Sequence, residues 1–248
     1  MKALRFLLII VCTLSLTGCA STKQADSDSS LGKAQQTLDS LYQHYSAKDS
    51  YLLRESYPFD ELHKVTYLAS EDQANMPNQF SYLWPYSGTF SAVNALLEAT
   101  HDKKYQQLLD KRVLPGLEEY FDIQRTPNAY SSYIQTAPTS DRFYDDNVWL
   151  GIDFTDIYQI TQEKRYLDKA QLIWKFIESG TDSLLGGGIY WCEQKKESKN
   201  TCSNAPGSVL ALKLFKATND SIYFRQGKEL YEWTQKNLQD STDYLYFD

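Results

Sequence analysis

The sequence is short of the residues that usually hold metal ions. Its 248 residues include only three histidines. His44, His63 and His101 fall outside any spacing that is typical of zinc ligands. We therefore expect no metal site, and we expect no cofactor.

Positive charge is also scarce. Lysine and arginine together number 25 against 32 acidic residues, which gives a formal net charge of −7. Proteins that bind nucleic acid carry basic patches for the phosphate backbone, so the composition argues against a nucleic-acid partner. Aromatic residues, by contrast, make up 14% of the chain and include 19 tyrosines. They suit both core packing and stacking on sugars.

Strand patterns are nearly absent outside GGGIYW (186–191), and helical periodicity takes their place. Three segments share a threonine, an acid two residues later and a tyrosine three residues after that: 100–105, 161–166 and 218–223. Amphipathic runs flank each segment, and the repeat is about 60 residues long. We therefore expect an all-α fold of stacked helical hairpins, with a tight turn at each threonine and each tyrosine in the core.

One more helix is expected near 34–46, as half of a preceding hairpin. Pro115 and Gly116 predict a kink or break in the second helix of the first full hairpin. The sequence ends on the apolar stretch STDYLYFD, whereas repeat arrays need polar end caps. We therefore expect a truncated array in this chain.

The N-terminal segment is typical of an export signal. Lys2 and Arg5 precede the apolar run 6–16, which is too short to span a bilayer. The sequence Leu-Thr-Gly-Cys at 16–19 resembles a bacterial lipobox. We expect a signal peptide over 1–18, lipid attachment at Cys19, a polar tether over 19–30 and a folded domain over 31–248. This predicts a lipoprotein of the bacterial cell envelope, on the outer membrane, the cell surface or the periplasmic side; an ordinary cleaved signal with a chance cysteine is the alternative.

Two further cysteines, Cys192 and Cys202, fall in the expected folded domain. In an exported protein they can form a disulfide that closes a short loop. A pair of free buried thiols is the alternative.

Long insertions precede the first helix of each hairpin, at 78–90, 126–147 and 183–206. They are rich in aromatic residues, asparagine, serine and glycine. Because they occupy equivalent positions in successive hairpins, we expect them to meet on one face of the array. An aromatic, polar and acidic face suits a carbohydrate cleft.

Adjacent carboxylates stand at Asp145 and Asp146, where an apolar helical pattern begins. With Asn147 they make a good helix N-terminus, and such a cap is the simplest interpretation. Retaining glycoside hydrolysis also needs two carboxyl groups in one cleft, about 5–5.5 Å apart. At a helix start both side chains can face the same cleft, with Phe143, Tyr144 and Trp149 supplying the burial that keeps one of them protonated.

Four segments, taken in order, resemble glycoside hydrolase family 76: YLWPYSGTFSAVNALLEAT (82–100), FYDDNVWLGIDFTDIYQITQEKRYLDKA (143–170), GGGIYW (186–191) and KNTCSNAPGSVLALKLF (199–215). The resemblance covers most of residues 80–248. It implies an (α/α)6 toroid with an open groove across the loop rim, and endo-acting α-1,6-mannanase activity by a retaining mechanism. It also implies that Asp145 is the nucleophile and Asp146 the general acid/base.

The same resemblance suggests residues that line the groove or support the pair. Three of them lie in the aspartate motif: Tyr144, Asn147 and Trp149. The others lie in the remaining segments: Trp84, Tyr86, Tyr190, Trp191 and Asn204. Core packing is the alternative for each aromatic residue. Gly186–Gly188 can let the backbone approach a substrate, or form a plain loop.

The leading interpretation is thus a lipid-anchored, monomeric glycoside hydrolase that cleaves α-mannan. A non-catalytic, lipid-anchored glycan-binding helical-repeat protein is the alternative from another class, but it does not need paired acids. Other toroidal enzymes, such as an unsaturated-uronide hydrolase or a sugar epimerase, fit the fold. Epimerases of that shape typically depend on histidines, which here lie outside the motif loops. A purely structural scaffold is the remaining alternative.

Overall fold

The computed structural model describes residues 29–62, 64 and 78–248. The expected signal peptide and Cys19 lie outside these residues. Within them, no helix has both the length and the apolar character needed to cross a membrane.

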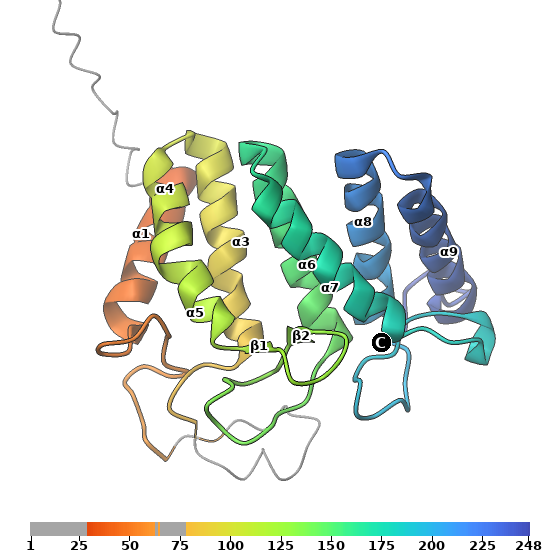
Figure 1. The fold of residues 1–248 in the computed structure, drawn as a ribbon, viewed down its shortest axis with the longest axis horizontal. Helices are drawn as coiled ribbons and strands as arrows, with labels where there is room; N and C mark the ends of the chain where they lie inside the picture. The colour runs from red at the N-terminus through yellow and green to blue at the C-terminus, as the bar shows by residue number, and fades with distance from the viewer. Residues whose placement is uncertain (1–28, 63, 65–77) are drawn as a thin grey trace, which may run out of the picture.

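The described chain is mostly helical, as the repeat predicts (Figure 1). The first helix is α1 (Ser30–Tyr45), close to its expected position. Three hairpins follow. The first pairs α3 (Leu83–Thr100) with a second helix in three pieces: α4 (Lys103–Leu108), the π-helical turn η1 (Leu109–Val113) and α5 (Leu114–Glu118). The second pairs α6 (Tyr144–Thr161) with α7 (Lys164–Ser179), and the third pairs α8 (Thr201–Thr218) with α9 (Ser221–Leu238). The short 3-10 helix η2 (Leu184–Gly186) lies between α7 and α8.

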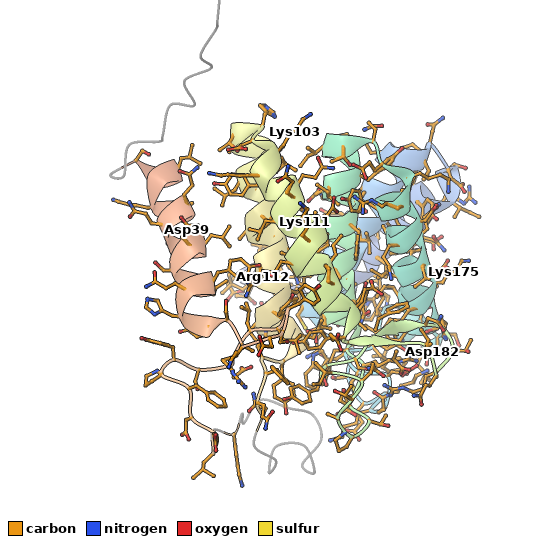
Figure 2. All side chains as sticks on the ribbon, turned by 60° about the vertical axis from the view of Figure 1, so that its left-hand side comes forward. Asp39, Lys103, Lys111, Arg112, Lys175 and Asp182 are labelled. Atoms are coloured by element: carbon orange, nitrogen blue, oxygen red, sulfur yellow. The ribbon has the colours of Figure 1, made fainter. Side chains whose placement is uncertain are left out.

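The tight turns lie at one end of the array and the long insertions at the other (Figure 1). Figure 2 shows this separation through Lys103, at the start of α4, and Asp182, in the loop after α7. Two short antiparallel strands, β1 (Phe121–Asp122) and β2 (Ala129–Tyr130), also lie at the insertion end. The expected meeting of the insertions on one face is therefore confirmed.

The repeated threonine forms the same turn in all three hairpins. Thr161, for example, is the last residue of α6, and its Oγ1 donates to the Ile157 carbonyl at 2.8 Å and accepts from the Glu163 amide at 3.3 Å. The residue after each threonine is left-handed, with φ of 55° to 61°, which ends the helix. The same bonds recur at Thr100 and Thr218.

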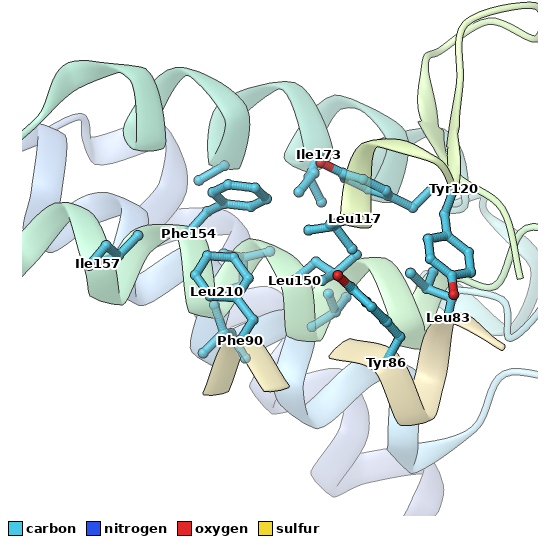
Figure 3. Packing of buried hydrophobic residues seen from close by; sticks show 14 of the residues in the cluster. Leu83, Tyr86, Phe90, Leu117, Tyr120, Leu150, Phe154, Ile157, Ile173 and Leu210 are labelled. Carbon is cyan, nitrogen blue, oxygen red and sulfur yellow. The ribbon is translucent and has the colours of Figure 1, made fainter. Parts of the chain in front are cut away.

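Helix α6 lies in the middle of the core, packed against α3, α7 and α8. Phe154 of α6 meets Phe90 of α3 edge-on, with ring centroids 4.9 Å apart (Figure 3). Gly151 lets Leu210 of α8 come close, because a Cβ at this glycine would lie 2.5 Å from a Leu210 methyl group. The core therefore fixes α6 in place, and with it the first turn that carries the aspartates.

The break expected at Pro115 and Gly116 occurs slightly earlier, as the π-helical turn η1. Proline lacks an amide hydrogen and disturbs the turn that precedes it. The Leu114 amide accordingly bonds to the Leu109 carbonyl, five residues back, as in a π-bulge. Gly116 has a packing role, because a Cβ there would overlap the Tyr86 hydroxyl at 2.0 Å.

Candidate active site

Residues from all three insertions line one cavity of about 170 Å³ at the loop end. They are Tyr82, Trp84, Ser132, Phe143, Asp145, Asp146 and Trp191. Four of the predicted site residues therefore share one cavity: both aspartates, Trp84 and Trp191. The sequence had not singled out Tyr82 or Ser132. Only their positions in the insertions could have indicated them: Tyr82 lies close to Trp84, and Ser132 lies in a polar stretch.

Asp145 and Asp146 occupy the first turn of α6, but neither is the capping residue. Phe143 holds the N-cap position and supplies no side-chain cap. The Asp145 carboxylate accepts the Asp146 amide at 3.0 Å. Because the turn points into the cavity, both carboxyl groups face it. The simple cap interpretation therefore does not account for their placement, although negative charge at this end favours the helix dipole.

The two carboxyl groups have different surroundings. Burial raises the pKa of Asp145, while hydrogen bonds from the Asp146 amide, the Trp191 indole and the Cys202 thiol act against that rise. Burial and the neighbouring Asp145 charge raise the pKa of Asp146 well above its usual range. Among the described residues, no side chain or amide donates a hydrogen bond to the Asp146 carboxyl group. The site therefore favours an ionised Asp145 beside a protonated Asp146.

Cys192 and Cys202 are free thiols, which corrects the disulfide expectation. The two sulfur atoms have different surroundings. Cys192 is buried and contacts the Gln194 side-chain oxygen at 3.8 Å, and burial raises its pKa to about 11. Cys202 lies at the start of α8, where burial and the Asp145 charge raise its pKa. Its thiol faces carboxylates instead of the other sulfur.

Tyr144 and Asn147 support the aspartate turn from behind and do not line the cavity. The Tyr144 ring is 1% exposed and stacks on Phe176, with centroids 4.6 Å apart. The Asn147 amide nitrogen donates to the Tyr130 carbonyl at 2.9 Å, and its oxygen accepts the Tyr130 amide at 2.9 Å. The pair of bonds ties β2 to α6. The predicted sugar contacts of Tyr144 and Asn147 are therefore wrong, and both side chains have a structural role.

Three more predicted sugar contacts are also buried. Tyr86 is a core residue that donates to the Val113 carbonyl at 3.0 Å (Figure 3). The Tyr190 hydroxyl donates to Asp182 at 2.7 Å. Asn204 is fully buried and exchanges two hydrogen bonds with the Ile189 backbone, at 2.6 and 2.9 Å. In each case the polar atom has an internal partner, so the core-packing alternative holds.

Trp84 and Trp149 are the exposed tryptophans of the motifs, with exposed fractions of 51% and 40%. Trp84 lines the cavity. Trp149 lies one turn further along α6 and does not line it, so its role in binding stays a prediction. Gly186–Gly188 line a different cavity, of about 500 Å³ between α7 and α9, and so they do not bring backbone to the aspartates.

No group of three or more histidine, cysteine or acidic side chains within residues 29–62, 64 and 78–248 is placed to hold a metal ion. The cavity thus offers two carboxyl groups, an indole N–H and aromatic walls. This arrangement suits acid–base and nucleophilic chemistry at an acetal carbon.

Comparisons with known proteins agree with this chemistry. The model of Glycosyl hydrolase family 76 matches residues 59–248. A search of the curated proteins finds no match. Among solved structures, the chain is similar to a family 76 mannosidase from Bacteroides thetaiotaomicron, with 30% identity and a TM-score of 0.74 over 88% of this chain and 56% of that one. It is also similar to a family 76 glycoside hydrolase from a bovine strain of that species, with 30% identity and a TM-score of 0.72 over 89% and 45%.

An α-1,6-mannanase of Salegentibacter has the same fold at 23% identity, with a TM-score of 0.64 over 87% of this chain and 54% of that one. That structure is an inactive variant, with two consecutive aspartates changed to asparagine, in complex with α-1,6-mannotriose. This chain therefore spans about half the length of the solved structures that it matches.

Proposed function

This chain belongs to glycosyl hydrolase family 76, and on that premise we propose that it hydrolyses α-1,6-mannosidic linkages within mannan. The observation that carries the proposal is the pair of unlike carboxyl groups in one cavity: Asp145, which accepts hydrogen bonds, and Asp146, which is buried and has no donor among the described residues. The mannosidase with 30% identity supports the sugar class. The mannanase of the same fold, inactive without two consecutive aspartates, supports the linkage and the pair.

The proposed mechanism has two displacements. The Asp145 carboxylate attacks the anomeric carbon while Asp146 gives its proton to the departing glycosidic oxygen, so a covalent mannosyl ester forms and the leaving chain departs as an alcohol. Asp146, now ionised, takes a proton from water. The resulting hydroxide attacks the same carbon, breaks the ester and restores both carboxyl groups with the original anomeric configuration.

The surroundings of each carboxyl group match its role. A nucleophile must be ionised, and hydrogen bonds to Asp145 favour the charged form. A general acid must carry a proton near neutral pH, and burial beside a negative charge keeps the proton on Asp146. Trp84 and the buried Phe143 line the cavity beside the pair.

We test this proposal by measuring product release from α-1,6-mannan. The full chain is compared with Asp145→Asn, Asp146→Asn and the control Asp168→Asn, whose carboxylate is exposed on α7 and pairs with Lys164. We expect each cavity variant to lose about a thousandfold or more in kcat/KM, and the control to keep its activity. Circular dichroism checks that each variant is folded.

A second substrate separates the two roles. An aryl α-1,6-mannobioside has a leaving group that needs no proton, so Asp146→Asn should retain more activity on it than Asp145→Asn does. If Asp146→Asn lost as much activity as Asp145→Asn on the aryl substrate as well as on mannan, the assignment of the two roles would be contradicted. Binding of mannotetraose without cleavage by the parent chain would favour the glycan-binding alternative.

A further inference from the structure

Trp191 touches the proposed nucleophile through its polar edge. Its indole Nε1 donates a hydrogen bond to Asp145 Oδ2 at 3.1 Å. One side of the ring packs against Phe143, with centroids 4.9 Å apart. A tryptophan that binds sugar usually offers its open face to the ligand. Here the N–H group is engaged and the ring is partly covered, so the contact differs from that of a stacking platform.

The backbone of Trp191 is fixed from two sides. Its amide donates to the Ser198 carbonyl at 3.0 Å, and its own carbonyl accepts the Tyr144 amide at 2.9 Å. The second bond joins Trp191 directly to the first residue of α6, next to Asp145. The indole and the carboxylate are therefore held in register by the backbone, without help from a ligand.

A buried arginine anchors the segment that follows Trp191. Arg142 is fully buried. Its guanidinium group donates to Glu193 Oε2 at 2.7 Å and to the Pro127 carbonyl at 2.8 Å. The Glu193 amide in turn donates to the Arg142 carbonyl at 3.0 Å. Since unpaired buried charge is costly, this network strongly favours one position of the segment.

A buried lysine anchors the segment that precedes Trp191. Lys199 is 8% exposed, and its Nζ donates to Asp182 Oδ1 at 2.6 Å, to the Leu184 carbonyl at 3.0 Å and to the Gly187 carbonyl at 2.7 Å. The three donors of the ammonium group are thus all used within one loop. Figure 2 shows Asp182 at the insertion end, where this loop lies.

We propose that Trp191 is a positioning residue for Asp145, in place of the sugar contact that the sequence suggested. The indole N–H orients the carboxylate and stabilises its ionised form, and the Arg142 and Lys199 networks hold the indole in place. This inference rests on the proposed function, because it assigns Asp145 the role of the nucleophile. It adds a residue outside the aspartate pair to the control of the reaction.

The test removes the N–H group and keeps an aromatic ring. Trp191→Phe is compared with Trp174→Phe, because Trp174 also donates its indole N–H to a side-chain oxygen, Gln226 Oε1, at the same 3.1 Å. Trp174 lies on α7 and does not line the aspartate cavity. The measurement is the pH profile of kcat/KM on α-1,6-mannan with the full chain.

We expect Trp191→Phe to move the acidic limb of the profile upward by about one pH unit, because loss of a donor raises the pKa of a carboxylate. At pH values below that limb, kcat/KM of Trp191→Phe should be about tenfold lower than that of the parent, and the difference should shrink as the pH rises. Trp174→Phe should leave both limbs where they are. A purely structural role would instead lower the rate equally at every pH, and that result, or an unchanged profile, would overturn the inference.

A second readout does not depend on catalysis. Aspartate carboxyl carbons labelled with 13C are titrated by NMR in the parent and in both tryptophan variants, with Asp145→Asn identifying the Asp145 signal. The Asp145 midpoint should rise in Trp191→Phe and stay constant in Trp174→Phe. If the parent fails to cleave mannan, the proposed function fails, whereas this titration still decides whether Trp191 stabilises the Asp145 carboxylate.

Discussion

At the residue scale, the site depends on how two identical side chains acquire different properties. Asp145 and Asp146 are neighbours in sequence and share one turn of α6. Within the part of the chain that the structure describes, Asp145 accepts hydrogen bonds and the Asp146 carboxyl group accepts none, while Asp146 is more deeply buried and lies beside the Asp145 charge. Because the two groups titrate together, the acidic and basic limbs of a rate profile belong to the pair. In the proposed mechanism, local donors therefore decide which carboxyl group attacks and which gives the proton.

A third buried aspartate provides a prediction about stability. Asp153, on α6, is 6% exposed and accepts the Ser91 hydroxyl at 2.7 Å. Burial raises the pKa of Asp153 to about 7, and the nearby Asp156 charge contributes to the rise. The hydrogen bond from Ser91 and the Lys213 charge oppose it. The folded chain thus retains a proton that the unfolded chain releases between about pH 4 and 7. Stability should be greatest below this window and fall as the pH rises through it.

Asp153→Asn removes this titration and keeps an oxygen to accept the Ser91 hydroxyl. The parent should lose about 2–3 kcal/mol of unfolding free energy between about pH 5 and pH 8 through this titration, and the variant should not. Urea unfolding at both pH values measures the change. Asp168→Asn, exposed on α7, serves as the control. A parent and an Asn variant that respond to pH in the same way would show that Asp153 is ionised in the folded chain.

At the element scale, each hairpin uses the same turn at one end and a different insertion at the other. The turns need a threonine followed by an acid, so their positions follow from sequence. At the third turn, for example, Thr218 Oγ1 accepts the Asp220 amide and the Asp220 carboxylate accepts the Ile222 amide. The insertions are held by ion pairs of two buried cations with residues distant in the sequence: Arg142 with Glu193, and Lys199 with Asp182. Their shape therefore depends on the assembled helices.

Two glycines of the third insertion give a matched test of this dependence. Gly186 and Gly188 both have positive φ, 75° and 83°, and a Cβ at Gly186 meets nothing within 4 Å. A Cβ at Gly188 would lie 2.7 Å from the Trp233 ring. Gly186→Ala should cost about 1–2 kcal/mol from backbone strain alone.

Gly188→Ala should cost clearly more than Gly186→Ala, because Trp233 must also move. It should lower activity as well, since the glycine belongs to the loop that leads to Trp191. Thermal unfolding and mannan cleavage measure the two effects. Equal losses of stability in the two variants would show that the ring yields to the added methyl group.

At the scale of the whole molecule, the described helices form an array with the insertions on one rim (Figure 1), and residues of the insertions line the cavity. Two family 76 structures that it matches are longer, and this chain covers 56% and 45% of them. The proposed function includes endo-acting cleavage, in which an internal linkage of mannan would enter the cavity without threading of a chain end.

The N-terminal segment gives a separate prediction for the whole molecule. We propose that the chain is anchored to the bacterial envelope by a lipid on Cys19. Growth with labelled palmitate should label the parent chain, and Cys19→Ala should abolish the label. Cys12→Ala is the matched control, because Cys12 lies inside the apolar run 6–16. Label that persists in Cys19→Ala would contradict the anchor.

The helical hairpins, the turns and the adjacent aspartates at a helix start could all be predicted from local patterns in the sequence. These features follow from local rules: amphipathic periodicity, a threonine–acid turn and carboxylates at a helix start. The break near Pro115 was also predictable to within a few residues, because proline acts on the turn before it. The family resemblance implied catalytic roles for Asp145 and Asp146; the structure places both in one cavity, and their roles stay a prediction.

Which aromatic and polar residues face the cavity depends on how the helices and insertions pack together, and no local pattern in the sequence specifies it. Tyr86, Tyr144 and Tyr190 looked as suitable as Trp84 and Trp191, because a tyrosine packs in a core as well as it lines a cleft. Partners distant in the sequence distinguish them: Val113 for Tyr86, Phe176 for Tyr144 and Asp145 for Trp191. The two free thiols follow the same rule, since the assembled helices and loops give each sulfur its own partner.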